Sequence, residues 1–230
     1  MILAIILMLG TLGMSLWATM RVKSTYNKYS QVPASSGYTG AECASRILDA
    51  AGIHDVEIIA QDGMLSDHYD PMNKRLVLSK ENYNGTSTAA LGVSAHECGH
   101  AIQHKIAYAP LHWRMAAVGV TSYANMAVTF LPLIGMFGMG FQSTTMIMIM
   151  AIGWGIIMLF NLVTLPVEFD ASRRAKVVLG KMSFIQPGEE ATAVKKVLDA
   201  AGWTYVAAFL TSLLYFLWYL LPLLMGRRDD

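Results

Sequence analysis

Residues 115–167 read MAAVGVTSYANMAVTFLPLIGMFGMGFQSTTMIMIMAIGWGIIMLFNLVTLPV, which is 53 positions without one charged side chain. A transmembrane helix needs roughly 20 consecutive apolar residues to cross the hydrocarbon core of a bilayer. The stretch is therefore too long for one membrane helix and about right for two. We predict spans at residues 115–138 and 144–165, with a break at residues 139–143 between them.

Two further uncharged blocks occupy residues 1–20 and 200–226. The chain of 230 residues is 54% hydrophobic and 14% charged, whereas soluble domains carry about 25% charged residues. We predict a third span at residues 2–20, an uncleaved anchor rather than a signal peptide because no Lys or Arg precedes it. A fourth span is predicted at residues 205–224. The sequence thus predicts a mainly α-helical membrane protein with four transmembrane helices.

Four spans place both chain termini on one side of the membrane and the polar segments 21–114 and 166–204 together on the other. These segments hold every Lys and Arg except Arg227 and Arg228. Cytoplasmic loops are enriched in Lys and Arg, so we predict that both polar segments are cytoplasmic. The two cysteines are too few to staple a secreted fold, and the net charge of +1 gives no sign of a nucleic-acid partner.

The chain is accordingly expected to have five parts, in which the two polar segments form one small α+β domain. The five parts are a transmembrane anchor at 1–20, a polar segment at 21–114, a transmembrane hairpin at 115–165, a second polar segment at 166–204, and a transmembrane helix with its tail at 205–230.

Local patterns place helices and strands in the first polar segment. Thr39 and Glu42 form a capping box, which predicts the start of a helix, and Gly52 supplies a stop signal for that helix. The other expected elements are a strand at 56–60, a hairpin whose strands at 63–69 and 75–78 flank the turn 70–74, and a helix at 87–105.

The helix expected at 87–105 contains His96-Glu97-Cys98-Gly99-His100, which matches the pattern H-E-x-x-H. Residues four apart lie on one helix face, so both imidazoles can bind one metal ion. Glu97 lies beside the pair and can take a proton from a zinc-activated water. A polar helix that happens to carry two histidines is the alternative, but shuffled sequences of this composition give the pattern in only roughly 0.5% of cases.

A catalytic zinc usually has three protein ligands and one open position. The metzincin pattern would place a third histidine at position 106, which is Ile106. His104 shares the face of the pair, but a helix rises about 6 Å over four residues, so three histidines cannot converge on one ion. Cys98 points off that face. We therefore expect an acid from the second polar segment. Glu168 is preferred to Asp170 because it follows 53 uncharged residues, and the other acid would orient a ligand histidine.

The motif HECGHAIQH at 96–104 is accompanied by LSDHYDP at 65–71 and LPVEFDASRRA at 165–175. Together these motifs resemble the YugP-type neutral zinc metallopeptidases, a family of bacterial membrane proteins, and the resemblance runs along most of the chain. It implies a zinc-dependent peptidase with a zincin-like domain, in which His96 and His100 bind the metal and Glu97 is the base. Gluzincins, which use a His, His, Glu ligand set, often carry Asp four residues after the ligand Glu, where this chain has Ser172.

The predicted function is that of a zinc metalloendopeptidase in the bacterial cell membrane, acting on a protein or peptide substrate. Candidate donors to the oxyanion that forms at the scissile bond are Arg173, Arg174 and Tyr69. One strand of the hairpin 64–78 can pair with an extended substrate, or it can simply support the domain. The sequence gives no signal of oligomeric state.

Two other functions fit parts of the sequence. An intramembrane protease would need its zinc motif inside a lipid-spanning helix, followed by an Asp-Gly ligand pair. The helix that carries the motif contains Glu97, His104 and Lys105, and no Asp-Gly pair follows it. A membrane-anchored adaptor or binding protein, with a structural zinc or none, is the alternative from another class. Structural zinc sites are usually closed by Cys and His ligands, so a Glu beside the pair argues against the adaptor.

Overall fold

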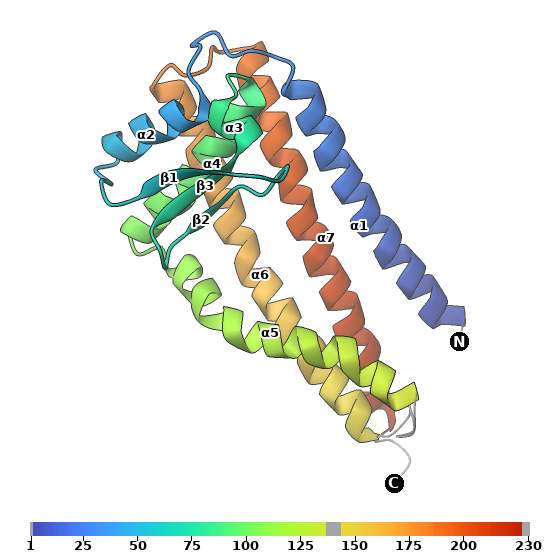
Figure 1. The fold of residues 1–230 in the computed structure, drawn as a ribbon. Coiled ribbons are helices and arrows are strands. Elements are labelled where there is room, and N and C mark those ends of the chain that lie inside the picture. Colours follow the sequence, from blue (N-terminus) through green and yellow to red (C-terminus); the bar gives the residue numbers. More distant parts are fainter. Residues whose placement is uncertain (1, 137–143, 227–230) are drawn as a thin grey trace. The chain divides into compact units, whose positions relative to one another are not determined.

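The computed structural model describes residues 2–136 and 144–226 (Figure 1). The predicted break at 139–143 lies outside these residues. The chain divides into two compact units. One contains the described residues of Met1–Ser15, His112–Leu165 and Tyr205–Asp230, and the other contains Leu16–Leu111 and Pro166–Thr204.

The structure confirms that the protein is mainly helical and contains four long apolar helices. Each is long and apolar enough to cross a membrane. The helices that contain the predicted spans at 144–165 and 205–224 also extend into the neighbouring polar segment. The four helices are α1 Ile2–Tyr29, α5 Ala109–Met136, α6 Thr144–Lys181 and α7 Glu189–Met225.

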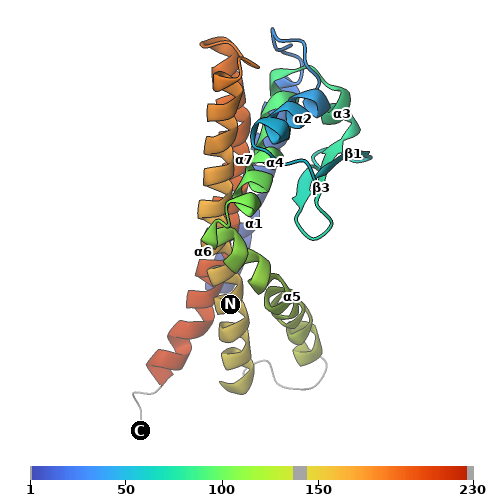
Figure 2. The ribbon, with the colours of Figure 1, turned by 90° about the vertical axis from the view of Figure 1, so that its left-hand side faces the viewer.

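In the first unit, α6 and α7 run side by side and are joined by polar and aromatic contacts (Figures 1 and 2). The amide of Asn161 donates to Ser212 Oγ at 3.0 Å and to the Ala208 carbonyl at 3.2 Å. The rings of Trp154 and Tyr215 stack with their centroids 4.5 Å apart. Hydrogen bonds and close packing of this kind hold helices together where no hydrophobic driving force acts between them.

The second unit contains a three-stranded sheet with the order β1-β3-β2. Strand β3 pairs in parallel with β1 and antiparallel with β2, so β2 is an edge strand. The turn before β3 forms as predicted, because the Asp70 carboxylate accepts from the backbone N–H groups of Met72 and Asn73. The strands are β1 Glu57–Gln61, β2 His68–Asp70 and β3 Arg75–Ser79.

The three shorter helices of the second unit begin with side-chain caps. The capping box of Thr39 and Glu42 forms as predicted at the start of α2. Ser87 caps the helix that carries the H-E-x-x-H motif by accepting from the Ala90 N–H. Between β3 and that helix lies a short helix, α3, which the sequence pattern does not predict. The bounds are α2 Gly40–Ala50, α3 Lys80–Asn84 and α4 Thr88–Lys105.

The core of the second unit packs α2, α4 and β3 against the polar ends of α6 and α7. Burial of these side chains fixes the orientation of α4, since its apolar positions face the core. The largest buried apolar side chains include Ile47, Leu76, Leu78, Leu91, Leu179 and Val194.

Helices α4 and α6 come into backbone contact at Gly99. A Cβ atom placed on Gly99 would lie 2.8 Å from the carbonyl oxygen of Ala171 and 3.1 Å from its Cα. Only glycine fits this approach without a shift of one backbone. Gly99 lies between His96 and His100 in the sequence, so the turn that carries the two histidines is the turn that touches α6.

We expect Gly99→Ala to destabilise the protein by about 1–3 kcal/mol, because the added methyl group must push two helix backbones apart. The measurement is the apparent Tm of the detergent-purified protein. Gly180→Ala is the matched control, since a Cβ on Gly180 meets no atom within 4 Å. That helical control should keep or slightly raise Tm, because alanine favours helix by up to about 1 kcal/mol over glycine. Equal Tm values for the two variants would contradict the close approach.

Candidate metal centre

Helix α4 presents His96 and His100 on one face, and α6 brings Glu168 up to them. The Oε2 atom of Glu168 lies 3.2 Å from His96 Nε2 and 3.5 Å from His100 Nε2. The two imidazole rings meet edge to face, with centroids 4.8 Å apart. Glu168 and His100 are buried and His96 is partly buried. The three residues singled out in the sequence as metal ligands therefore come together in space.

The two contacts of Glu168 with the imidazoles have the spacing of donor atoms in a tetrahedral zinc site. One nitrogen or oxygen from each residue lies within 4.8 Å of the others. With zinc–ligand bonds of about 2.0–2.2 Å, donor atoms in a tetrahedral site lie about 3.3–3.6 Å apart. The two distances from Glu168 Oε2, 3.2 and 3.5 Å, match this spacing. Two imidazoles and one carboxylate are also one of the donor sets found in catalytic zinc sites.

The outer nitrogen of each histidine has a hydrogen-bond partner. His96 Nδ1 lies 3.1 Å from Ser172 Oγ, and His100 Nδ1 lies 3.0 Å from Gln103 Oε1. These contacts turn both Nε2 atoms toward Glu168 and orient the rings. Ser172 occupies the position where gluzincins often carry Asp, and the hydroxyl contacts the histidine there. Gln103 is not among the residues predicted from the sequence, although its place three residues after His100 was a usable signal.

Asp170, the second acid considered as a ligand, does not join the cluster. Its carboxylate pairs with the guanidinium groups of Arg173 and Arg174, the latter at 2.6 Å, and accepts from Gln103 Nε2 at 2.9 Å. Asp170 thus reaches His100 only through Gln103. Two of the three predicted oxyanion donors, Arg173 and Arg174, are engaged by the same carboxylate.

Glu97 is buried, with 7% of its surface exposed. Burial raises the pKa of the Glu97 carboxyl; nearby His96 and His100 lower it and Glu168 raises it further, and the net pKa is raised. For His100, burial alone would lower the pKa, but the hydrogen bond and charge of Glu168 outweigh it and leave the pKa raised. A buried carboxyl with a raised pKa holds a proton more readily than an exposed one, which suits a group that takes up a proton and gives it back.

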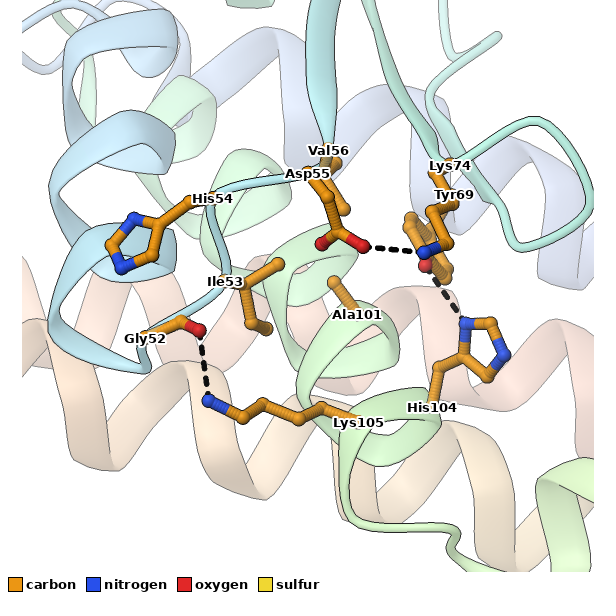
Figure 3. Close-up of a pocket in the computed structure, with 10 residues that line it drawn as sticks. All are labelled: Gly52, Ile53, His54, Asp55, Val56, Tyr69, Lys74, Ala101, His104 and Lys105. Atoms are coloured by element: carbon orange, nitrogen blue, oxygen red, sulfur yellow. Dashed lines mark hydrogen bonds and ion pairs between the residues drawn. The ribbon is translucent and has the colours of Figure 1, made fainter.

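A pocket of about 540 Å³ opens beside the C-terminal half of α4 (Figure 3). Ala101, His104 and Lys105 line one wall, so the pocket begins at the residue next to His100. On the opposite wall, Tyr69 of β2 lies with its hydroxyl 2.9 Å from His104 Nδ1. The edge strand β2 therefore contacts α4 near the C-terminal end of that helix.

Asp67 fixes the segment that leads into β2. Its carboxylate accepts from the Ser79 N–H at 2.7 Å and from the Asn82 amide at 2.9 Å. The carbonyl oxygen of the Asn82 amide in turn accepts from the Tyr26 hydroxyl at 2.7 Å. Because the side chain of Asp67 bonds the Ser79 N–H, residues before His68 form a loop, and β2 is shorter than the strand predicted at 63–69.

The H-E-x-x-H helix, with both histidines facing a glutamate of a second helix, is typical of zinc metallopeptidases. The chain belongs to the family described as "Putative neutral zinc metallopeptidase", whose profile matches residues 4–224. It is 43% identical over 228 residues to "Putative membrane protease YugP" of Bacillus subtilis (strain 168), an alignment that covers 99% of this chain and 100% of that relative. No solved structure matches the chain. The family resemblance seen in the sequence is thus confirmed.

We expect Asp67→Ala to lower the free energy of unfolding by about 1.5–3 kcal/mol, because it removes hydrogen bonds to a charged group and leaves buried partners unpaired. Thermal unfolding in detergent measures the loss. Asp62→Ala is the control: Asp62 pairs with Lys80 at the surface with its side chain 85% exposed, and such pairs contribute about 0–1 kcal/mol. A larger effect of Asp62→Ala than of Asp67→Ala would sink this account.

Proposed function

We propose that the protein is a membrane-bound zinc metalloendopeptidase, with His96, His100 and Glu168 as zinc ligands and Glu97 as general base. The observation that carries the proposal is that the Glu168 carboxylate of α6 meets the two imidazoles of α4 at zinc-like spacing. Helix α4 also bears Glu97. When bound, zinc polarises the scissile carbonyl and lowers the pKa of water toward about 7.

Glu97 moves the proton in this mechanism. Its carboxylate takes the proton from the attacking water, and the protonated carboxyl then delivers it to the amine of the leaving fragment. The raised pKa that burial gives Glu97 favours holding the proton between these two steps. Tyr69 is the candidate we favour for donating to the oxyanion, because it lines the pocket beside α4 whereas Arg173 and Arg174 are paired with Asp170; its hydroxyl would exchange the contact with His104 for one with the substrate.

The substrate is proposed to bind as an extended chain along β2. An edge strand leaves one row of backbone N–H and C=O groups without a strand partner, and an added peptide can pair with that row. β2 is an edge strand of the sheet that the structure describes, and Tyr69 brings it to α4. The pocket beside Ala101 can then accept a substrate side chain (Figure 3). Backbone pairing implies cleavage with little sequence preference.

The enzyme is proposed to be a multi-pass protein of the cell membrane, with segments 21–114 and 166–204 forming a cytoplasmic catalytic domain. Four apolar helices and the name of the relative support the membrane location. The distribution of Lys and Arg supports the cytoplasmic side. A structural zinc would normally recruit cysteine, and Cys98 instead directs its Sγ toward the Ala44 carbonyl at 3.6 Å. That contact favours the peptidase over an adaptor.

We expect Glu97→Gln to keep about one zinc per chain and to lower peptide cleavage by a factor of about 10²–10⁴, since the amide cannot accept the proton from water. Zinc is measured by elemental analysis of the detergent-purified protein and cleavage with a quenched-fluorescent peptide library. Glu57→Gln, at an exposed ion pair with Arg75, is the control and should retain activity. Undiminished cleavage by Glu97→Gln would refute the mechanism.

We expect Glu168→Ala to lose the zinc and Asp170→Ala to keep about one zinc per chain, because only the Glu168 carboxylate reaches both Nε2 atoms. The same elemental analysis, after dialysis against a weak chelator, separates the two variants. Zinc retained in Glu168→Ala and lost in Asp170→Ala would reverse the ligand assignment. No zinc in carefully handled wild-type protein would remove the peptidase proposal and favour the adaptor.

A further inference from the structure

Gln103 is a fully buried amide on α4, three residues after His100. Its Oε1 lies 3.0 Å from His100 Nδ1. Its Nε2 donates to the Val167 carbonyl at 2.8 Å and to the Asp170 carboxylate at 2.9 Å. Every polar atom of this side chain thus has a partner inside the protein.

The partners of Gln103 determine which way its amide faces. A backbone carbonyl accepts hydrogen bonds and cannot donate, and the same holds for the Asp170 carboxylate beside Arg173 and Arg174. The two hydrogens of the amide must therefore point at Val167 and Asp170. The amide oxygen is left facing His100, and that oxygen can only accept.

The orientation of the amide in turn determines which nitrogen of the neutral imidazole carries the hydrogen. Because Gln103 Oε1 can only accept, His100 Nδ1 must carry a hydrogen and donate it. The lone pair of the neutral ring is then on Nε2, the nitrogen that lies 3.5 Å from Glu168. Ser172 sets no such constraint on His96, since a hydroxyl can donate or accept.

We infer that Gln103 is a positioning residue that holds His100 as its Nδ1–H tautomer, with Nε2 ready to bind metal, and ties this ligand to the segment that supplies Glu168. The inference rests on the proposed zinc site. Val167 directly precedes Glu168, and Asp170 follows Glu168 by two residues. One side chain therefore orients the ring of His100 and also fixes the position of that ring relative to α6. Outer hydrogen bonds of this kind tune metal affinity by about 10–100-fold.

The first test replaces Gln103 by an apolar side chain of the same length. Gln103→Met should weaken zinc binding by about 10–100-fold in competition with a chelator. It should also change the visible spectrum of the cobalt(II)-substituted protein, because the ring of His100 is free to turn. Asn82→Leu is the matched control: this amide is equally buried and hydrogen-bonded but contacts Asp67 and Tyr26. It should lower Tm while leaving zinc affinity and the cobalt spectrum unchanged.

The second test restores a hydrogen-bond acceptor for His100 by placing a carboxylate at position 103 and an amide at position 170. In the double variant Gln103→Glu/Asp170→Asn, one carboxylate oxygen accepts from His100 and the other accepts from the new amide at position 170. The Val167 carbonyl loses its donor in this variant, as it also does in Gln103→Met/Asp170→Asn, so the two variants differ in the acceptor offered to His100. Zinc affinity and the cobalt spectrum should return toward those of wild type, relative to Gln103→Met/Asp170→Asn. This comparison also decides the matter if Gln103→Met alone fails to fold.

The outcomes separate the inference from the proposed function. If wild type binds zinc and cleaves peptides, and Gln103→Met binds zinc with wild-type affinity and spectrum, Gln103 is only structural and the inference fails alone. A double variant no better than Gln103→Met/Asp170→Asn also overturns it. If wild type binds no zinc, the proposed function fails and the inference falls with it.

Discussion

The contact between α4 and α6 at Gly99 and Ala171 is the constraint on which the candidate site depends. The two histidines and the glutamate come from segments about 70 positions apart, and each helix alone offers an incomplete ligand set. A glycine between the histidines lets the backbones approach closely enough for Glu168 to reach both rings. The H-E-x-x-H motif thus supplies two of the donor side chains and also the glycine that lets α6 pack closely enough to supply the third.

The close contact between α4 and α6 also explains why the polar groups around the cluster can be buried. An isolated buried carboxylate is costly, and it is tolerated when charged or hydrogen-bonding partners surround it. Glu168 has two imidazoles beside it, and each imidazole has an outer partner, Ser172 or Gln103. Since packing and hydrogen bonds hold the three candidate ligands in place, their side chains need to move little to bind a metal.

Features that depend on residues within one helical turn, or within one uncharged stretch, could be predicted from the sequence. The four long helices, the capping box at Thr39 and the pairing of His96 with His100 are of this kind. Glu168 was favoured over Asp170, but the reason lay in composition; the physical reason is that Glu168 and Ser172 are four residues apart and face α4 together. That face could not be assigned because nothing in the sequence showed α6 continuing past residue 165. Gln103 was missed because glutamine is usually exposed, and its burial depends on contacts with α6.

The assembly of the site also constrains how the chain can cross a membrane. His96 and Glu168 belong to one compact unit, and residues 112–165 of the other unit lie between them in the sequence. A single crossing by these residues would put the histidines and the glutamate on opposite sides of the bilayer, and three crossings would do the same. An intact cluster therefore requires an even number of crossings between residues 112 and 165. The uncharged stretch of 53 residues is long enough for two helices and too short for four, so if these residues enter the membrane, the intact cluster favours the predicted hairpin of two spans.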